Sequence, residues 1–230
     1  MKRLIVMVMM GIVMFAMVRS ASALGVSVGA SAWYADWQIQ EPAGSWDTMD
    51  STLLYGPVLA LRFTQELSLS SAFLYGVFKH TDGSGNPEEI ERIDSDSALI
   101  YGLGRYFKVF AGFKYIGYTV GSTRHASFGP GLGIGLVAPL RENLFFIANV
   151  SGMYLWGKDT GGENSDDITF IEYAYNSNAA LTYVFSSAPV SISLGGRYQY
   201  IESHYDEIYD RDMKQRIFGV TVSAIYSFEI

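Results

Sequence analysis

The chain contains no cysteine and little proline, and beyond its first residues it has no long apolar run. The lack of cysteine excludes disulfides, thiolate metal sites and a lipid attached through cysteine. After residue 23 no apolar run is long enough to cross a membrane as a helix. Bases are also scarce: of 16 Lys and Arg residues, Lys2, Arg3 and Arg19 lie in the first 23 positions, which leaves 13 against 23 acids. Nucleic acid is therefore a poor partner, because nothing offsets phosphate repulsion.

The first 23 residues have the pattern of a secretory signal peptide. Lys2 and Arg3 precede an apolar run from Leu4 to Val18, and Ala-Ser-Ala at residues 21–23 follows. A retained membrane anchor is the alternative, but the run is shorter than the roughly 20 apolar residues of a spanning helix. We therefore expect cleavage after Ala23 and a single mature domain over residues 24–230.

The rest of the sequence alternates apolar with small or polar residues, most clearly at its end. From Phe218 to Ile230 the even positions are all apolar, and the odd positions are small or polar except Ile225. A period of two predicts β-strands, because successive side chains point to opposite faces of a sheet. Pro57 interrupts one such segment, and we expect a bulge there. The pattern predicts ten strands, at residues 24–40, 52–64, 67–80, 90–106, 109–120, 125–140, 144–157, 168–185, 190–201 and 213–230.

The connections between these strands alternate in length. Those after every second strand have about two to four residues, and the others about nine to twelve, except a short one near Gly121. This favours an all-β fold, a transmembrane antiparallel up-and-down β-barrel of ten strands, with eight as the alternative number. Apolar faces would point to lipid and small polar faces into the lumen, because closure satisfies every backbone group. Aromatic residues gather near the strand ends, as in interfacial girdles.

The signal peptide, the alternating segments and the ending Phe218 to Ile230 resemble the small outer-membrane β-barrel proteins of Gram-negative bacteria. The resemblance covers the mature chain and names a superfamily. It implies an outer-membrane location with both termini periplasmic and the long loops extracellular. The implied partners are membrane lipid, lipopolysaccharide and the barrel assembly machinery, and a monomer is favoured. The last strand would be the assembly signal, carried by Gly219, Tyr226, Phe228 and Ile230.

Two sets of residues are predicted to line the lumen. Charges inside a narrow wall are costly unless they are paired, so we expect ion pairs across the lumen and a largely plugged barrel. The glycine spacing does not match a phosphate-binding loop and would instead leave room for large inward residues such as Trp33, Phe110, Tyr118 or Phe145. The charged set is Arg62, Arg92, Asp94, Asp96, Lys114, Glu172 and Arg197, and the glycine stripe is Gly129, Gly131, Gly133 and Gly135.

The long-loop side carries the three histidines, His80, His125 and His204, and nearly all the acids. A metal site or a hydrolase could be built there, but no motif of an outer-membrane protease or lipid A deacylase is present. The acids are either simply solvated or bind divalent cations that bridge to lipopolysaccharide. We predict a non-enzymatic envelope barrel with acidic extracellular loops, without catalytic residues, cofactor or metal. The alternatives are a narrow pore for small solutes and an outer-leaflet hydrolase.

Overall fold

The computed structural model describes residues 24–40, 44–81, 87–161, 167–205 and 212–229. The predicted leader, residues 1–23, and Ile230 lie outside the described residues. Within them no helix is long and apolar enough to span a membrane. The strands are β1 (Gly25–Gln40), β2 (Trp46–Thr48), β3 (Thr52–Arg62), β4 (Leu67–Thr81), β5 (Pro87–Leu103), β6 (Phe107–Val120), β7 (Thr123–Arg141), β8 (Leu144–Thr160), β9 (Ile168–Val184), β10 (Val190–Tyr205) and β11 (Met213–Glu229).

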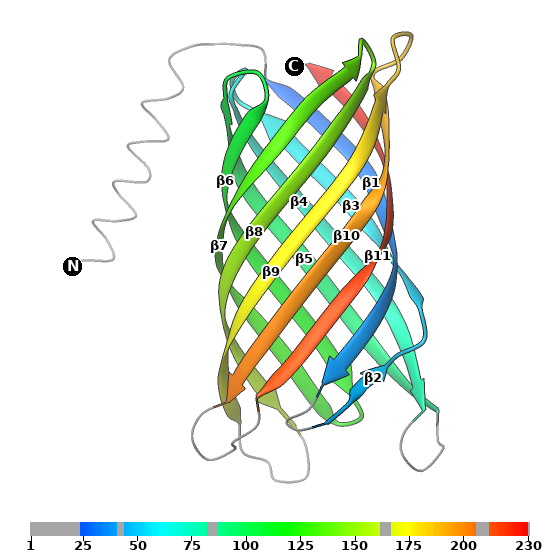
Figure 1. Ribbon diagram of the computed structural model, residues 1–230, viewed down its shortest axis with the longest axis vertical. Coiled ribbons are helices and arrows are strands. Elements are labelled where there is room, and N and C mark those ends of the chain that lie inside the picture. The colour runs from blue at the N-terminus through cyan, green and yellow to red at the C-terminus, as the bar shows by residue number, and fades with distance from the viewer. Residues whose placement is uncertain (1–23, 41–43, 82–86, 162–166, 206–211, 230) are drawn as a thin grey trace, which may run out of the picture.

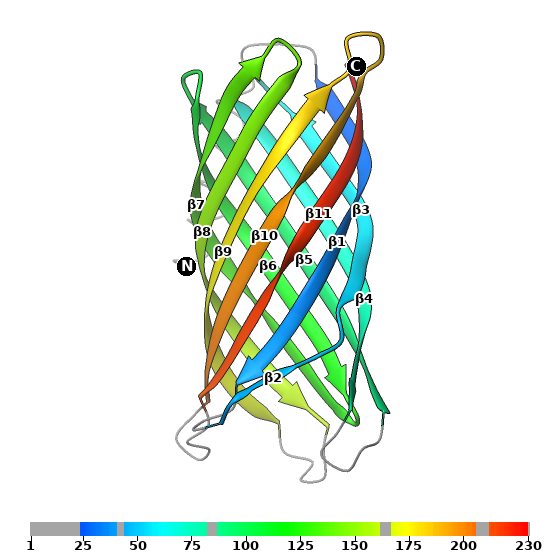
Figure 2. The ribbon, with the colours of Figure 1, turned by 45° about the vertical axis from the view of Figure 1, so that its right-hand side comes forward.

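All the long strands form one closed antiparallel sheet (Figures 1 and 2). Each pairs with its neighbour along the chain, and β1 pairs with both β3 and β11, which closes the barrel. β1 begins and β11 ends at the same end of the barrel as the short turns (Figure 1). The predicted up-and-down barrel of ten long strands is therefore confirmed, and the alternative number of eight is wrong.

The short strand β2 lies within residues 41–51, where the sequence predicts a loop. Residues 46–48 pair with residues 38–40 of β1. The amide of Met49 then donates to the Trp37 carbonyl at 2.9 Å, and that of Asp50 donates to the Lys79 carbonyl at 2.8 Å. These bonds extend the hydrogen-bond ladder of β1 beyond β3. β2 therefore pairs with the same edge of β1 as β3 does.

The expected bulge at Pro57 is absent. Pairing between β3 and β4 lapses at Gly56 and Pro57 and resumes in the same register, with Tyr55 opposite Tyr75 and Val58 opposite Ala72. Proline lacks an amide hydrogen, so it removes ladder bonds without requiring an extra residue. A register shift lies instead near the end of β7, between Pro139 and Arg141.

Side chains alternate between the outer surface and the lumen in the predicted phase. Tyr34 is 56% exposed, whereas its neighbours Trp33 and Ala35 are fully buried. Leu132 and Ile134 of β7 likewise point outward, and the glycines between and beside them line the inner face. An outward apolar face over this part of the barrel is what a lipid environment requires.

In the half of the barrel nearer the long loops, the polarity of the two faces reverses. A crossing strand needs only about 9–11 residues, and most of these strands have 14 to 19. In that half outward positions include charged side chains beyond aromatics such as Tyr34 and Tyr173, whereas inward positions include many buried apolar side chains. The sequence pattern predicts a small polar inner face over the whole length, and this prediction is wrong for this half. The outward charges include Lys79, Glu89, Glu91 and Lys158, and the inward apolar residues include Phe78, Ile90, Leu155 and Ile201.

Candidate functional site

The lumen has three layers. Nearest the short turns is a cavity of about 370 Å³, lined mainly by small and polar side chains. At mid-depth a network of charged residues crosses the lumen. Beyond it, toward the long loops, the lumen is packed with apolar residues that are almost completely buried.

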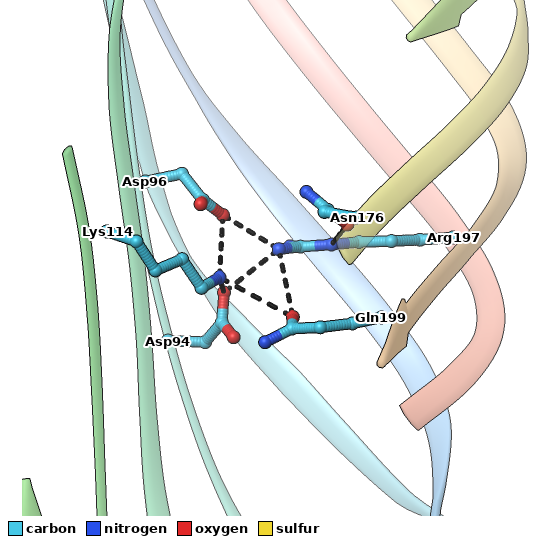
Figure 3. A network of polar contacts seen from close by, with 6 residues as sticks. All are labelled: Asp94, Asp96, Lys114, Asn176, Arg197 and Gln199. Carbon is cyan, nitrogen blue, oxygen red and sulfur yellow. Dashed lines mark hydrogen bonds and ion pairs between the residues drawn. The ribbon is translucent and has the colours of Figure 1, made fainter. Parts of the chain in front are cut away.

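The mid-depth network joins opposite walls of the barrel (Figure 3). Lys114 of β6 places its Nζ 2.6 Å from Asp94 Oδ1 and 3.1 Å from Asp96 Oδ2, both on β5. Arg197 of β10 reaches the same two oxygens with Nη2, at 3.1 Å and 2.7 Å. Two cations therefore share two carboxylates, and the four charges cancel.

Neighbouring amides complete this network. The Arg197 Nε donates to Asn176 Oδ1 at 3.1 Å, and Arg197 Nη2 and Lys114 Nζ approach Gln199 Oε1 at 3.4 Å and 3.5 Å. The Arg197 guanidinium also lies over the Trp33 ring, 4.5 Å from its centroid. Asp94 is fully buried, whereas the Asp96 side chain keeps 33% exposure toward the cavity. Solvent therefore reaches the network from the short-turn side.

The structure brings together four of the seven charged residues predicted to pair: Asp94, Asp96, Lys114 and Arg197. The other three do not join this network, because they lie at other depths. Arg62 is at the short-turn rim, where it pairs with Glu229. Glu172 belongs to a separate cluster near the long loops. Arg92 lies one inward position beyond Asp94 and makes no ion pair within the described part of the chain.

Arg92 is fully buried, and none of its three guanidinium nitrogens has a hydrogen-bond partner among the described residues. Its charge lies over aromatic rings instead, 4.6 Å from the centroid of Trp37 and 5.7 Å from that of Tyr118. Cation–π attraction strengthens when the cation is desolvated, which offsets part of the cost of burying this group.

Arg92 is surrounded by the apolar layer, most of which the sequence pattern does not predict. Only Trp33 and Tyr118 of this set were expected to point inward. The sequence does contain a signal for this layer, because apolar residues move to the inward positions and charged residues to the outward ones. An example is Ile90, which faces inward between the outward Glu89 and Glu91. The buried members are Trp33, Ala35, Trp37, Met49, Leu54, Leu74, Phe78, Ile90, Ile116, Tyr118, Leu155, Ala174, Ile201 and Ile217.

A second polar cluster lies beside this layer and is centred on His125. Its Nδ1 is 2.8 Å from Asp159 Oδ1. Its Nε2 is 3.2 Å from Glu172 Oε1, an electrostatic contact whose geometry is not that of a hydrogen bond. Ser127 and Ser203 donate to the two Glu172 oxygens at 2.5 Å and 2.7 Å. The cluster thus ties β7, β8, β9 and β10 together.

The three histidines are separate. The His125 ring is stacked between Tyr118 and Phe170, with centroid distances of 4.2 Å and 4.5 Å. His80 faces Asp47 at 3.2 Å, and His204 faces Asp212 at 3.0 Å. Among the residues that the structure describes, no group of three or more His, Asp or Glu is arranged to hold a metal ion.

The glycine stripe lies on the inner face of β7 and makes room for larger residues, as expected. A Cβ at Gly133 would lie 2.2 Å from the Phe110 ring, and one at Gly131 would lie 2.4 Å from Met153 Cγ. At Gly129 the obstacle is backbone, the Tyr154 carbonyl oxygen at 2.0 Å. Phe110 therefore occupies the predicted space.

The residues of the predicted assembly signal lie along the closing seam between β11 and β1. A Cβ at Gly219 would lie 2.0 Å from the Tyr34 carbonyl oxygen, so this position admits only glycine without a shift of the strands. Tyr226 and Phe228 point outward and are exposed, which matches the predicted register. Ile230 lies outside the described residues.

Comparisons with protein-family models and with curated proteins find no match. Among solved structures, the outer-membrane protease OmpT from Escherichia coli is similar over 91% of this chain and 99% of that chain, with 10% identity and a TM-score of 0.60. The COG4313 outer-membrane channel from Pseudomonas putida F1 matches over 90% of this chain and 96% of its own, with 11% identity and a TM-score of 0.39. Ail of Yersinia pestis matches over 88% of this chain and 98% of its own, with 14% identity and a TM-score of 0.29.

The likeness to OmpT defines the class of fold. This chain has the fold of the small outer-membrane β-barrel proteins, a closed antiparallel barrel of ten long strands. At 10% identity the similarity carries the fold alone, so function has to be argued from the lumen.

Proposed function

We propose that this protein is a non-enzymatic outer-membrane barrel whose lumen is closed to solute flow. Its long-loop end faces the cell exterior, and both termini lie on the periplasmic side. The observation that carries the proposal is the packing of the long-loop half of the lumen, where Trp37, Leu54, Ile116, Ile201 and Ile217 have no exposed surface. Its role would then be at the envelope surface, in contact with lipid and lipopolysaccharide.

A narrow pore is the first rival function. A conducting pore needs a continuous wet path through the whole lumen. Here the path from the short-turn cavity meets Lys114 and Arg197, which are bridged by shared carboxylates, and then the fully buried Trp33 and Trp37. Opening this path would break buried ion pairs and expose apolar surface, both of which are costly.

An outer-leaflet hydrolase is the second rival, and the His125 cluster is the observation in its favour. A serine hydrolase needs a serine whose hydroxyl is hydrogen-bonded to the base. Ser127 and Ser203 donate to Glu172 instead, and the His125 side chain is only 3% exposed between two rings. These contacts favour a structural role that fixes the long-loop end of four strands.

We expect the acids at the long-loop end to face the cell exterior, and a contact between them and lipopolysaccharide to require divalent cations. Asp47, Glu89, Asp167 and Asp212 are each more than half exposed. Each also faces a neighbouring base or histidine, so their charges are partly balanced locally. Bridging through divalent cations would rely on the remaining acids of these loops.

Solute flux into lipid vesicles tests the closed lumen. Vesicles that contain the folded barrel should swell in isotonic arabinose or glycine no faster than protein-free vesicles, whereas vesicles with a porin should swell rapidly. A swelling rate that rises in proportion to the amount of this protein would contradict the closed lumen and support the narrow-pore function.

A further inference from the structure

The short-turn end of the lumen contains a blind vestibule, which we define as the cavity of about 370 Å³ lined by residues of nine strands. It ends at the Lys114–Arg197 network and lies on the periplasmic side in the orientation proposed above. Ligand pockets commonly have volumes of about 300–1,000 Å³, so this space suits a small molecule. The inference does not depend on whether the lumen conducts, because binding requires only access from the short-turn end.

The vestibule wall offers hydrogen-bonding groups on several sides and one aromatic surface. The ring of Phe110 packs against Gly133 and forms an apolar part of the wall. The carboxylate of Asp96 forms part of the floor and is still one-third exposed. The hydroxyl and amide groups come from Ser31, Ser70, Ser151, Ser193, Thr221, Ser223, Asn149, Asn176 and Asn178.

Two polar groups in this wall lack a partner among the described residues. Asn149 donates through Nδ2 to Asn178 Oδ1 at 2.7 Å, but its own buried Oδ1 accepts no hydrogen bond. Lys108 lines the same cavity and makes no ion pair within the described ranges. The two are adjacent, since a Cβ at Gly135 would lie 2.3 Å from Asn149 Oδ1 and 2.4 Å from Lys108 Cε.

The charges of the vestibule are therefore unbalanced. At its floor Lys114 and Arg197 are neutralised by Asp94 and Asp96. Lys108 adds a cation that no acid among the described residues neutralises. A complementary ligand has one anionic group for Lys108 and hydroxyl groups that donate to Asp96, whose carboxylate is one-third exposed.

We propose that the vestibule binds a small hydroxylated carboxylic acid that enters from the short-turn end. Its carboxylate pairs with Lys108, its hydroxyls bond to the amides, serines and Asp96, and its carbon chain packs against Phe110. A neutral polyol of the same length would make the hydroxyl contacts but would leave Lys108 unpaired, so it should bind more weakly.

Calorimetric titration of the folded barrel in detergent, at constant ionic strength, tests this with two matched six-carbon probes, D-gluconate and D-sorbitol. Gluconate should bind the wild type and sorbitol should bind at least about tenfold more weakly, since one charged hydrogen bond is lost. Lys108→Met should weaken gluconate by a similar factor and leave sorbitol unchanged. Lys79→Met, at the far end of the barrel, is the control and should bind gluconate like the wild type.

A cysteine in the vestibule gives a second measurement that does not depend on Lys108 variants. Thr221 lines the cavity, and the chain has no native cysteine. Gluconate should slow the reaction of Thr221→Cys with a small methanethiosulfonate reagent, and sorbitol should slow it much less. The proposal is overturned if gluconate neither binds nor protects. It is also overturned if gluconate and sorbitol bind the wild type with equal affinity and Lys108→Met changes neither affinity.

Discussion

Lys114 is the residue on which the cross-lumen network most depends, because its ammonium is buried against Asp94 and Asp96. Lys114→Met should lower the free energy of unfolding by about 3 kcal/mol, since it leaves a buried carboxylate without full compensation. Lys79→Met is the control, because Lys79 is exposed and 3.8 Å from Glu89, and such pairs contribute about 1 kcal/mol or less. Urea unfolding in lipid vesicles measures both. Equal stability of the two variants would show that the network is not needed for stability.

The pairing of Lys114 with Asp96 could be predicted from strand register, whereas for Arg197 the sequence predicts a contact across the lumen but not its partners. Once strand boundaries are assigned, register places Asp96 directly opposite Lys114 on the same inner face. Arg197 reaches the same carboxylates across the lumen, and this depends on the barrel radius and on side-chain reach. The His125 cluster is beyond prediction for the same reason, since its members come from four strands.

At the level of the strand, alternation located every long element but did not reveal the change along its length. The expected second strand, residues 52–64, corresponds to β3 at Thr52–Arg62. The inner face of β6, in contrast, passes from Lys108 through Lys114 to the buried Ile116 and Tyr118. The period stays at two while the environment changes, so periodicity alone could not locate the apolar layer. β2 was missed because three residues are too few to show a period.

The last strand allows a matched comparison between its two faces. Phe228→Asp places a charge on the outward face near the strand end, at an equilibrium cost of about 1 kcal/mol or less. The larger expected effect is failed assembly, because Phe228 belongs to the predicted assembly signal. Ser227→Asp adds the same charge on the inward side, where Ser227 hydrogen-bonds to Ser27, and should assemble.

Heat-modifiable migration of membrane fractions on gels measures the amount of folded barrel in both variants. Phe228→Asp should be depleted and Ser227→Asp should be close to wild type. Normal amounts of folded Phe228→Asp would show that Phe228 is not part of the assembly signal.

For the whole molecule, the orientation can be tested at two exposed turn serines. Ser122 lies in the turn between β6 and β7, and Ser187 lies between β9 and β10 at the opposite end. In a chain without native cysteine, Ser122→Cys should react with a bulky impermeant maleimide on intact cells, and Ser187→Cys only after the outer membrane is opened. Labelling of Ser187→Cys alone on intact cells would invert the orientation.

The closed lumen is the central claim, and recordings from planar bilayers test it most directly. Folded wild-type protein should produce no steady or stepwise current, because the Lys114–Arg197 network and the buried layer around Trp37 interrupt the ion path. A porin recorded in the same bilayers shows that conducting barrels would be detected. Stable stepwise channels of porin-like size from the wild type would contradict the closed lumen.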